Sequence, residues 1–202
     1  MSLDAPSLSA HELRDRLESR PVSDREVLLK GMVWDVVRDT VDLGEAGTVR
    51  REYVLHPGAV GTVAMDDKGR ILLVQQYRHP VGHYDWELPA GLLDVEGEPP
   101  WEAAARELHE EAGLEAAQIG GPVGEPHFFD ISLGRVCQFN FVVQGKLDAA
   151  EVKLDPKEHQ NFVWATEAEV KADKAGNVDL VFTRDEVKRT VLSAFDHHRE
   201  QK

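Results

Sequence analysis

Three glutamates, Glu107, Glu110 and Glu111, have a spacing that could hold a cation. On a helix, positions i, i+3 and i+4 share one face, so the three carboxylates would lie side by side and repel one another. Carboxylate oxygens are ligands that Mg²⁺ and Mn²⁺ accept in proteins, and a bound Mg²⁺ often bridges to a phosphate group. The spacing therefore indicates a divalent-cation site for a phosphorylated substrate, with a solvated acidic helix face as the alternative.

The charge around these glutamates is one-sided. From Asp85 to Glu115 there are ten acidic side chains against one basic side chain, Arg106, which accounts for −9 of the formal net charge of −14. A fold that gathers these charges on one surface needs solvent or a cation to screen them. Arg106 follows Glu98 by eight residues, so a bidentate pair between them could fasten the loop before the helix.

Local signals predict the elements that position these side chains. Pro99-Pro100 can begin a helix and Gly113 can end one, which predicts a helix over 100–112. One arc of this helix would face a core, and its members are Trp101, Ala104, Ala105, Leu108 and Ala112. Before the helix, Trp86–Gly91 reads as a strand that ends in a Pro-Ala-Gly turn, whose carbonyls could face the same cation.

The remaining chain predicts a layered α/β (α+β) domain with an extension before it. A helix over 10–18 and β-rich runs at 26–42 and 48–56 favour a helix and a small antiparallel sheet in the extension, residues 1–57. Pro57-Gly58 reads as the boundary. The domain would occupy 58–202. Its other expected elements are strands over 59–65, 71–77, 135–144 and 160–165 and helices over 166–173 and 184–198.

Composition restricts the class of protein and partner. With 202 residues, of which 42% are hydrophobic, the chain can bury a sizeable core. The net charge of −14 argues against a nucleic-acid partner. No apolar run is long enough to predict a membrane span, and the first residues lack a leader pattern. Because Cys137 is the single cysteine, we expect a reducing compartment and a cytoplasmic protein.

The segment from Glu98 to Leu114 resembles the signature of the Nudix hydrolases. Its matching letters are Glu98, Arg106-Glu107-Leu108, Glu110-Glu111 and Gly113-Leu114. If each fixed letter occurs at about 6% of positions, such a pattern arises by chance in far fewer than about one in a million chains of this length. The family's glycine normally stands six residues before the first glutamate, whereas Gly91 stands seven before it. The turn therefore carries one extra residue.

The resemblance implies an α/β/α sandwich around a mixed sheet and hydrolysis of a nucleoside diphosphate linked to another group. It also implies Mg²⁺, or Mn²⁺ in its place, as the cofactor. The metal ligands would be Glu107, Glu111, the nearby Glu110 and the main-chain carbonyl of Ala90. Glu98 and Arg106 would fasten the loop to the helix.

Segments outside the signature are similar to the ADP-ribose pyrophosphatase branch of the family. These segments are Val49–Glu52, His56–Val60, Gln75–Arg78 and Trp86–Gly91. In that branch the amino-terminal extension is exchanged across a homodimer and helps to enclose the adenosine. The resemblance therefore implies that a homodimer of this chain hydrolyses ADP-ribose to AMP and ribose 5-phosphate.

The same branch suggests side chains that contact the substrate. Arg51 and Glu52 would reach the partner subunit's substrate, with a cross-strand surface pair as the alternative. Arg78 would meet the diphosphate, or be an ordinary charge at a strand end. Trp34 could stack on a base, or pack in a core or interface. Glu87, in the Trp-Glu-Leu-Pro-Ala-Gly segment, completes this set.

A general base for the attacking water is expected in the polar loop Lys146–Gln160. A carboxylate on a mobile loop can orient and deprotonate water once substrate is bound. In the ADP-ribose pyrophosphatase branch the base is a glutamate a few residues before a strand, and Glu158 matches that placement best. Glu151 is the next candidate, and a solvated loop carboxylate is the alternative for Glu158.

Two other functions stay open. The branch has a proline about sixteen residues beyond the signature, where this chain has Asp130. A UDP- or GDP-sugar diphosphatase is therefore the nearest alternative substrate class. A Nudix-type module that binds a nucleotide without hydrolysing it is the alternative of another class, although such modules usually lose part of the carboxylate set that this chain keeps.

Overall fold

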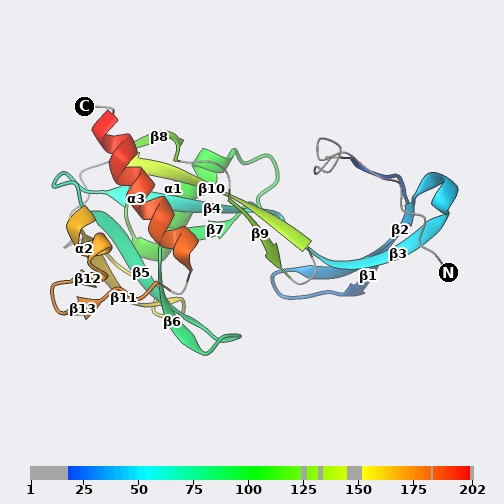
Figure 1. Ribbon diagram of the computed structural model, residues 1–202, viewed down its shortest axis with the longest axis horizontal. Coiled ribbons are helices and arrows are strands. Elements are labelled where there is room, and N and C mark those ends of the chain that lie inside the picture. The colour runs from blue at the N-terminus through cyan, green and yellow to red at the C-terminus, as the bar shows by residue number, and fades with distance from the viewer. Residues whose placement is uncertain (1–17, 124–126, 132–133, 145–151, 183, 201–202) are drawn as a thin grey trace, which may run out of the picture. The chain divides into compact units, whose positions relative to one another are not determined.

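The computed structural model describes residues 18–123, 127–131, 134–144, 152–182 and 184–200 (Figure 1). The chain divides into two compact units, with the boundary between Leu55 and His56. Two expectations lie outside the described residues: the helix over 10–18, apart from Glu18, and the alternative base Glu151.

The first unit contains a three-stranded antiparallel sheet. Its elements are β1 (Val22–Leu29), β2 (Asp35–Asp42), the 3₁₀ turn η1 (Gly44–Ala46) and β3 (Thr48–Leu55), with β2 in the centre. Among residues 18–55, Val37 is the one fully buried apolar side chain. Beside it, the buried Asp39 accepts hydrogen bonds from Nε of Arg25 at 2.7 Å and from the hydroxyl of Tyr53 at 2.8 Å. A polar network therefore joins all three strands.

The second unit is built on an eight-stranded mixed sheet. Its main path, in the order β11-β5-β4-β10-β8, consists of β11 (His159–Ala165), β5 (Ile71–Arg78), β4 (Ala59–Met65), β10 (Gly134–Gln144) and β8 (Gln118–Pro122). Three more strands pair beside this path: β6 (His83–Glu87) on β5, β7 (Ala90–Leu92) on β4 and β9 (His127–Ile131) on β10. The sheet is mixed because β10 is parallel to β4 while the other pairs are antiparallel.

Helices cover both faces of this sheet (Figure 1). They are α1 (Pro100–Ala112), α2 (Glu167–Lys171) and α3 (Asp185–Glu200), and a small hairpin, β12 (Lys174–Ala175) and β13 (Val178–Asp179), follows α2. Alternate residues of β5 enter different clusters: Ile71 and Leu73 pack with Phe195 of α3, and Leu72 packs with Leu108 of α1. The expected α/β/α sandwich is therefore confirmed. No helix among the described residues has the length and apolar character needed to cross a membrane.

The helix α1 has the predicted bounds, but its buried arc differs from the expected one. It begins at Pro100 and ends before Gly113, whose left-handed backbone (φ 67°) allows the chain to turn away. Trp101 was expected in the core and is 50% exposed, whereas Ala103 is fully buried. Helical periodicity predicts which side of a helix faces the sheet, but it does not predict where along the helix the sheet ends. Trp101 lies in the first turn of α1, at the edge of its contact with the sheet.

The centre of the sheet separates to admit β6 and β7. β4 and β5 pair with each other only at Met65 and Ile71, next to the turn that joins them. Beyond that pair, β6 lies along β5 and β7 lies along β4. The chain crosses between them at Pro89, whose carbonyl accepts a hydrogen bond from the Thr62 N–H at 2.7 Å. The turn between β6 and β7 is thereby held in the middle of the sheet, against α1.

Candidate functional site

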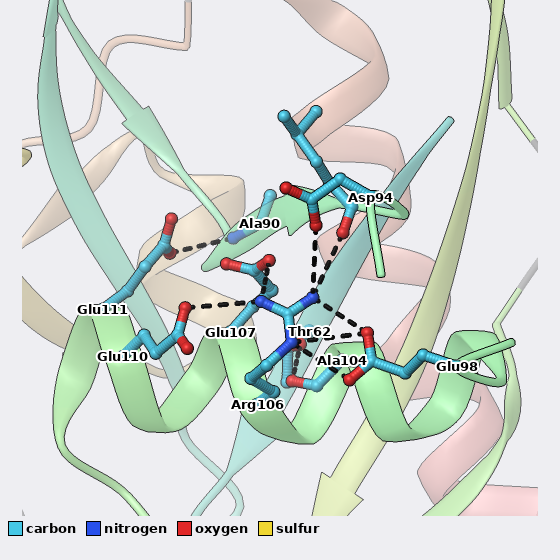
Figure 2. A network of polar contacts seen from close by, with 10 residues as sticks. Thr62, Ala90, Asp94, Glu98, Ala104, Arg106, Glu107, Glu110 and Glu111 are labelled. Carbon is cyan, nitrogen blue, oxygen red and sulfur yellow. Dashed lines mark hydrogen bonds and ion pairs between the residues drawn. The ribbon is translucent and has the colours of Figure 1, made fainter. Parts of the chain in front are cut away.

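The helix α1 presents Glu107, Glu110 and Glu111 on one side (Figure 2). Glu107 and Glu111 are buried, with 9% and 6% of their surface exposed, whereas Glu110 is exposed. Burial is the largest cause that raises the pKa of both buried glutamates. Two adjacent buried carboxylates are costly when both are ionised, and a cation between them would offset that cost. These donors therefore fit a divalent metal ion.

The turn between β6 and β7 closes over these two glutamates. The N–H of Ala90 donates to Oε2 of Glu111 at 2.9 Å. A Cβ placed on Gly91 would come within 1.8 Å of Cδ of Glu107, so a larger residue at position 91 would displace this carboxylate. We expected the carbonyl of Ala90 at the metal; the contact that the structure provides is from its N–H to the acidic cluster.

Arg106 connects the loop before α1 to the acidic face, as its spacing from Glu98 predicts (Figure 2). Nε and Nη2 of Arg106 donate to the Glu98 carboxylate at 3.0 and 2.9 Å, and Nη2 also donates to the Leu92 carbonyl at 3.3 Å. Nη1 lies 2.6 Å from Oε1 of Glu107 and 3.3 Å from Oε2 of Glu110. The guanidinium lowers the pKa of Glu98. One cation thus holds the loop and two of the three clustered glutamates.

A second polar group lies on the face of the sheet that α1 covers. The register of β5 and β6 places Arg78 and Glu87 there, and Nε of Arg78 donates to Oε1 of Glu87 at 2.8 Å. This hydrogen bond is the largest cause that raises the pKa of Arg78, to which the charges of Asp85 and Glu111 also contribute. Arg184 lies 3.3 Å from Oε2 of Glu87. Arg78 and Glu87, both expected at the substrate, are therefore paired with each other.

The base candidate Glu158 lies close to the acidic helix. Glu158 is exposed, and its N–H donates to the carbonyl of Asp155 at 3.1 Å in the turn before β11. One donor atom each of Glu111, Glu158 and His159 lie within 4.8 Å of one another. The fold thus brings Glu158 to the side of α1 on which Glu111 lies.

Three polar residues beside the site were not expected from the sequence. Asp85 is buried, and its Oδ1 has no hydrogen bond from the described residues. Its position two residues before Glu87 on a strand could have indicated it, because such residues share a face. Arg184 and His159 come from distant segments, and no local pattern points to their contacts with Glu87 and Glu111.

Three of the expected substrate contacts belong to the first unit: Arg51, Glu52 and Trp34. Arg51 and Glu52 are neighbours on β3, so their side chains point to opposite faces of that sheet. Nε and Nη2 of Arg38 donate to Oε1 of Glu52 at 2.8 and 2.6 Å. Glu52 thus makes a cross-strand surface pair. Trp34 lies between β1 and β2 and is 44% exposed.

Comparison with known proteins identifies relatives of this chain. An ADP-ribose pyrophosphatase of Mycobacterium tuberculosis is 56% identical over 92 residues, which are 46% of this chain and 44% of that protein. An ADP-ribose pyrophosphatase of Bacillus subtilis is 39% identical over 103 residues, which are 51% of this chain and 55% of that protein. The chain therefore spans about half the length of the curated relatives it matches.

The fold and the family agree. A solved structure described as an ADP compounds hydrolase has a TM-score of 0.63 to this chain at 18% identity, covering 93% of this chain and 98% of that one. This likeness shows the fold alone. The family model described as the NUDIX domain matches residues 55–185, which include α1 with its three glutamates and the turn that closes over two of them. The chain therefore belongs to the NUDIX domain family.

Proposed function

We propose that this chain hydrolyses ADP-ribose to AMP and ribose 5-phosphate in a reaction that depends on Mg²⁺, with Mn²⁺ as the alternative. The observation that carries the proposal is the buried pair Glu107 and Glu111, packed against the turn at Ala90 and Gly91. The substrate is supported by two relatives named ADP-ribose pyrophosphatase, at 56% and 39% identity.

The proposed metal ligands are Glu107, Glu111, Glu110 and the carbonyl of Ala90. A cation bound there would neutralise the diphosphate and lower the pKa of a bound water. Arg106 and Glu98 are the proposed positioning pair, because their contact fixes the loop before α1 while Arg106 also holds Glu107.

Glu158 is the proposed general base. Its carboxylate would accept a proton from the attacking water while the water oxygen bonds to phosphorus and the bond from phosphorus to the leaving phosphate oxygen breaks. Its position in an exposed turn close to Glu111 supports this role.

Arg78 and Glu87 are the proposed substrate contacts within the second unit. If Arg78 leaves Glu87 to reach the diphosphate, the buried Glu87 carboxylate loses one of its two counter-charges. Arg184 lies 3.3 Å from Glu87 and can remain as its counter-charge. Arg78 can therefore move to the substrate while Arg184 stays paired with Glu87.

The active form that we propose is a cytoplasmic homodimer with its catalytic domain at 58–202. Arg51, Glu52 and Trp34 would contribute to the partner subunit's substrate site. The exposed apolar side chains Leu29, Met32 and Val33 support a partner surface on the first unit, since they are 61%, 105% and 63% exposed. The single cysteine, Cys137, supports a reducing compartment.

A substrate panel tests this function. We expect the highest kcat/KM for ADP-ribose among ADP-ribose, UDP-glucose and GDP-mannose, with AMP as the nucleotide product. A higher kcat/KM for UDP-glucose or GDP-mannose would replace the proposal with a sugar-nucleotide diphosphatase. Binding of ADP-ribose without turnover of any of the three would identify a nucleotide-binding module instead.

A further inference from the structure

His159 is a buried imidazole that the proposed reaction does not use. It begins β11, where its backbone pairs with Gln76 of β5, and the register turns its side chain to the face that α1 covers. Its side chain is 3% exposed, and its Nε2 lies 3.2 Å from Oε2 of Glu111. The fold therefore places a ring nitrogen directly beside one of the clustered carboxylates.

Both ring nitrogens of His159 lack a hydrogen bond from the described residues. The 3.2 Å approach of Nε2 to Oε2 of Glu111 is an ion-pair contact. Burial of a polar group without a hydrogen bond destabilises a fold. Oε2 of Glu111 meanwhile accepts a well-formed hydrogen bond from the Ala90 N–H. The imidazole thus has an unused lone pair in an acidic environment.

The distances suit two ligands of one metal ion. Ligands at about 2.0–2.2 Å from a Zn²⁺ ion lie about 2.8–3.6 Å from each other when the angle between them at the ion is about 90–110°. Nε2 of His159 and Oε2 of Glu111 are 3.2 Å apart. A third donor, the exposed Glu158, lies within 4.8 Å of both. Its exposure leaves the carboxylate free to complete the shell.

We propose that His159, Glu111 and Glu158 form a mixed nitrogen and oxygen site that prefers a transition-metal ion such as Zn²⁺ to Mg²⁺. Mg²⁺ favours oxygen ligands, whereas an imidazole nitrogen favours Zn²⁺ and its neighbours in the transition series. The proposal rests on the proposed function only in sharing two residues with it, the metal ligand Glu111 and the general base Glu158. Glu158 would use one oxygen for the ion and keep the other to orient water.

Cation binding without substrate tests this site. The variant is His159→Gln, and the control is His109→Gln, since His109 lies on α1 with a 57% exposed side chain paired to Glu115. We expect His159→Gln to weaken Zn²⁺ binding at least about tenfold and to leave Mg²⁺ binding within about twofold. His109→Gln should change neither. Equal losses of Zn²⁺ and Mg²⁺ affinity, or no loss of Zn²⁺ affinity, would overturn the proposal.

Co²⁺ in place of Zn²⁺ provides a direct readout in the unsubstituted protein. Proton NMR of the Co²⁺ form should show a hyperfine-shifted imidazole N–H resonance that persists in His109→Gln and disappears in His159→Gln. Absence of such a resonance in the unsubstituted chain would overturn the site even if His159→Gln failed to fold. A chain that shows the resonance but releases no AMP from ADP-ribose would contradict the proposed function and leave this site standing.

Discussion

The Cα atom of Gly91 lies against the carboxylate of Glu107. A Cβ built on Gly91 would stand 1.8 Å from Cδ and 2.0 Å from Oε2 of Glu107. Gly91 cannot move away freely, because its backbone pairs with Val60 in β4. The site therefore needs a glycine here for space, and the position of Glu107 depends on it.

Gly91→Ala should displace Glu107 and lower kcat/KM by about 10²-fold, since a small misplacement at a catalytic centre can cost that much. Because the added Cβ meets only the far end of the Glu107 side chain, the free energy of unfolding should fall by no more than about 1 kcal/mol. The matched control is Gly121→Ala in β8, where an added Cβ meets nothing within 4 Å. Steady-state kinetics and urea unfolding measure both effects. Full activity of Gly91→Ala would contradict the proposed role of Glu107.

Arg106→Gln should lower the free energy of unfolding by about 1–2 kcal/mol, because it leaves the mostly buried carboxylates of Glu98 and Glu107 without their cation. The control is Arg189→Gln, whose 69% exposed side chain pairs with Glu186 and should contribute less than about 0.5 kcal/mol. Urea unfolding of both variants measures the difference. Equal destabilisation would show that Arg106 does not fasten the loop.

Glu111→Gln should have opposite effects on stability with and without metal. The pKa of Glu111 is raised, chiefly by burial, so its ionised form destabilises the fold at pH values above that raised pKa. In EDTA the variant should therefore melt higher than the unsubstituted chain at neutral pH. The advantage should shrink as the pH falls and Glu111 takes up a proton.

With Mg²⁺, the melting temperature of the unsubstituted chain should rise and that of Glu111→Gln should not. Thermal unfolding between about pH 5 and pH 8 measures both trends. Glu102→Gln, an exposed residue in the first turn of α1, controls for the loss of one negative charge. A lower melting temperature of Glu111→Gln in EDTA at neutral pH would contradict this interpretation of its burial.

Glu158→Gln should lower kcat by about 10²- to 10⁴-fold with little change in KM, as expected when proton transfer is lost but binding is kept. Initial rates over a range of ADP-ribose concentrations separate the two constants. If kcat stays within a few-fold of the parent while Glu151→Gln or Glu110→Gln abolishes turnover, the role of base belongs to that other residue.

Sedimentation should show a homodimer at micromolar concentration. Two apolar side chains of the first unit, Met32 and Val33, are 105% and 63% exposed, so a charge placed there by Val33→Asp should shift the population to monomer. A monomer with full activity in the unsubstituted chain would contradict the proposed exchange of residues between subunits.

Short-range signals predicted the parts of the site that lie within one segment of chain. The proline at Pro100 and the glycine at Gly113 set the ends of α1, because one lacks a backbone donor and the other tolerates a left-handed conformation. The pair of Arg106 with Glu98 followed from its eight-residue spacing. The strands β4 and β5 also lie where expected, over 59–65 and from 71 onward, since turn residues separate two apolar runs.

Contacts between distant segments could not be predicted in this way. His159 meets Glu111, and Arg184 meets Glu87, only because β11 and the start of α3 are placed by packing of the whole sheet. The burial of Glu107 and Glu111 could not be predicted either, because carboxylates normally face solvent. Trp101 is the opposite case: it is an apolar side chain that was expected in the core, but it is half exposed because it lies at the edge of the contact between α1 and the sheet.

The most direct test of the central claim is the rate at which the purified chain forms AMP from ADP-ribose with Mg²⁺ and with EDTA. We expect AMP and ribose 5-phosphate in equal amounts with Mg²⁺, and no more than the uncatalysed rate with EDTA or in Glu107→Gln with Mg²⁺. AMP formation that continues at the same rate in EDTA, or in Glu107→Gln, would contradict the claim that these buried carboxylates hold the metal for this reaction.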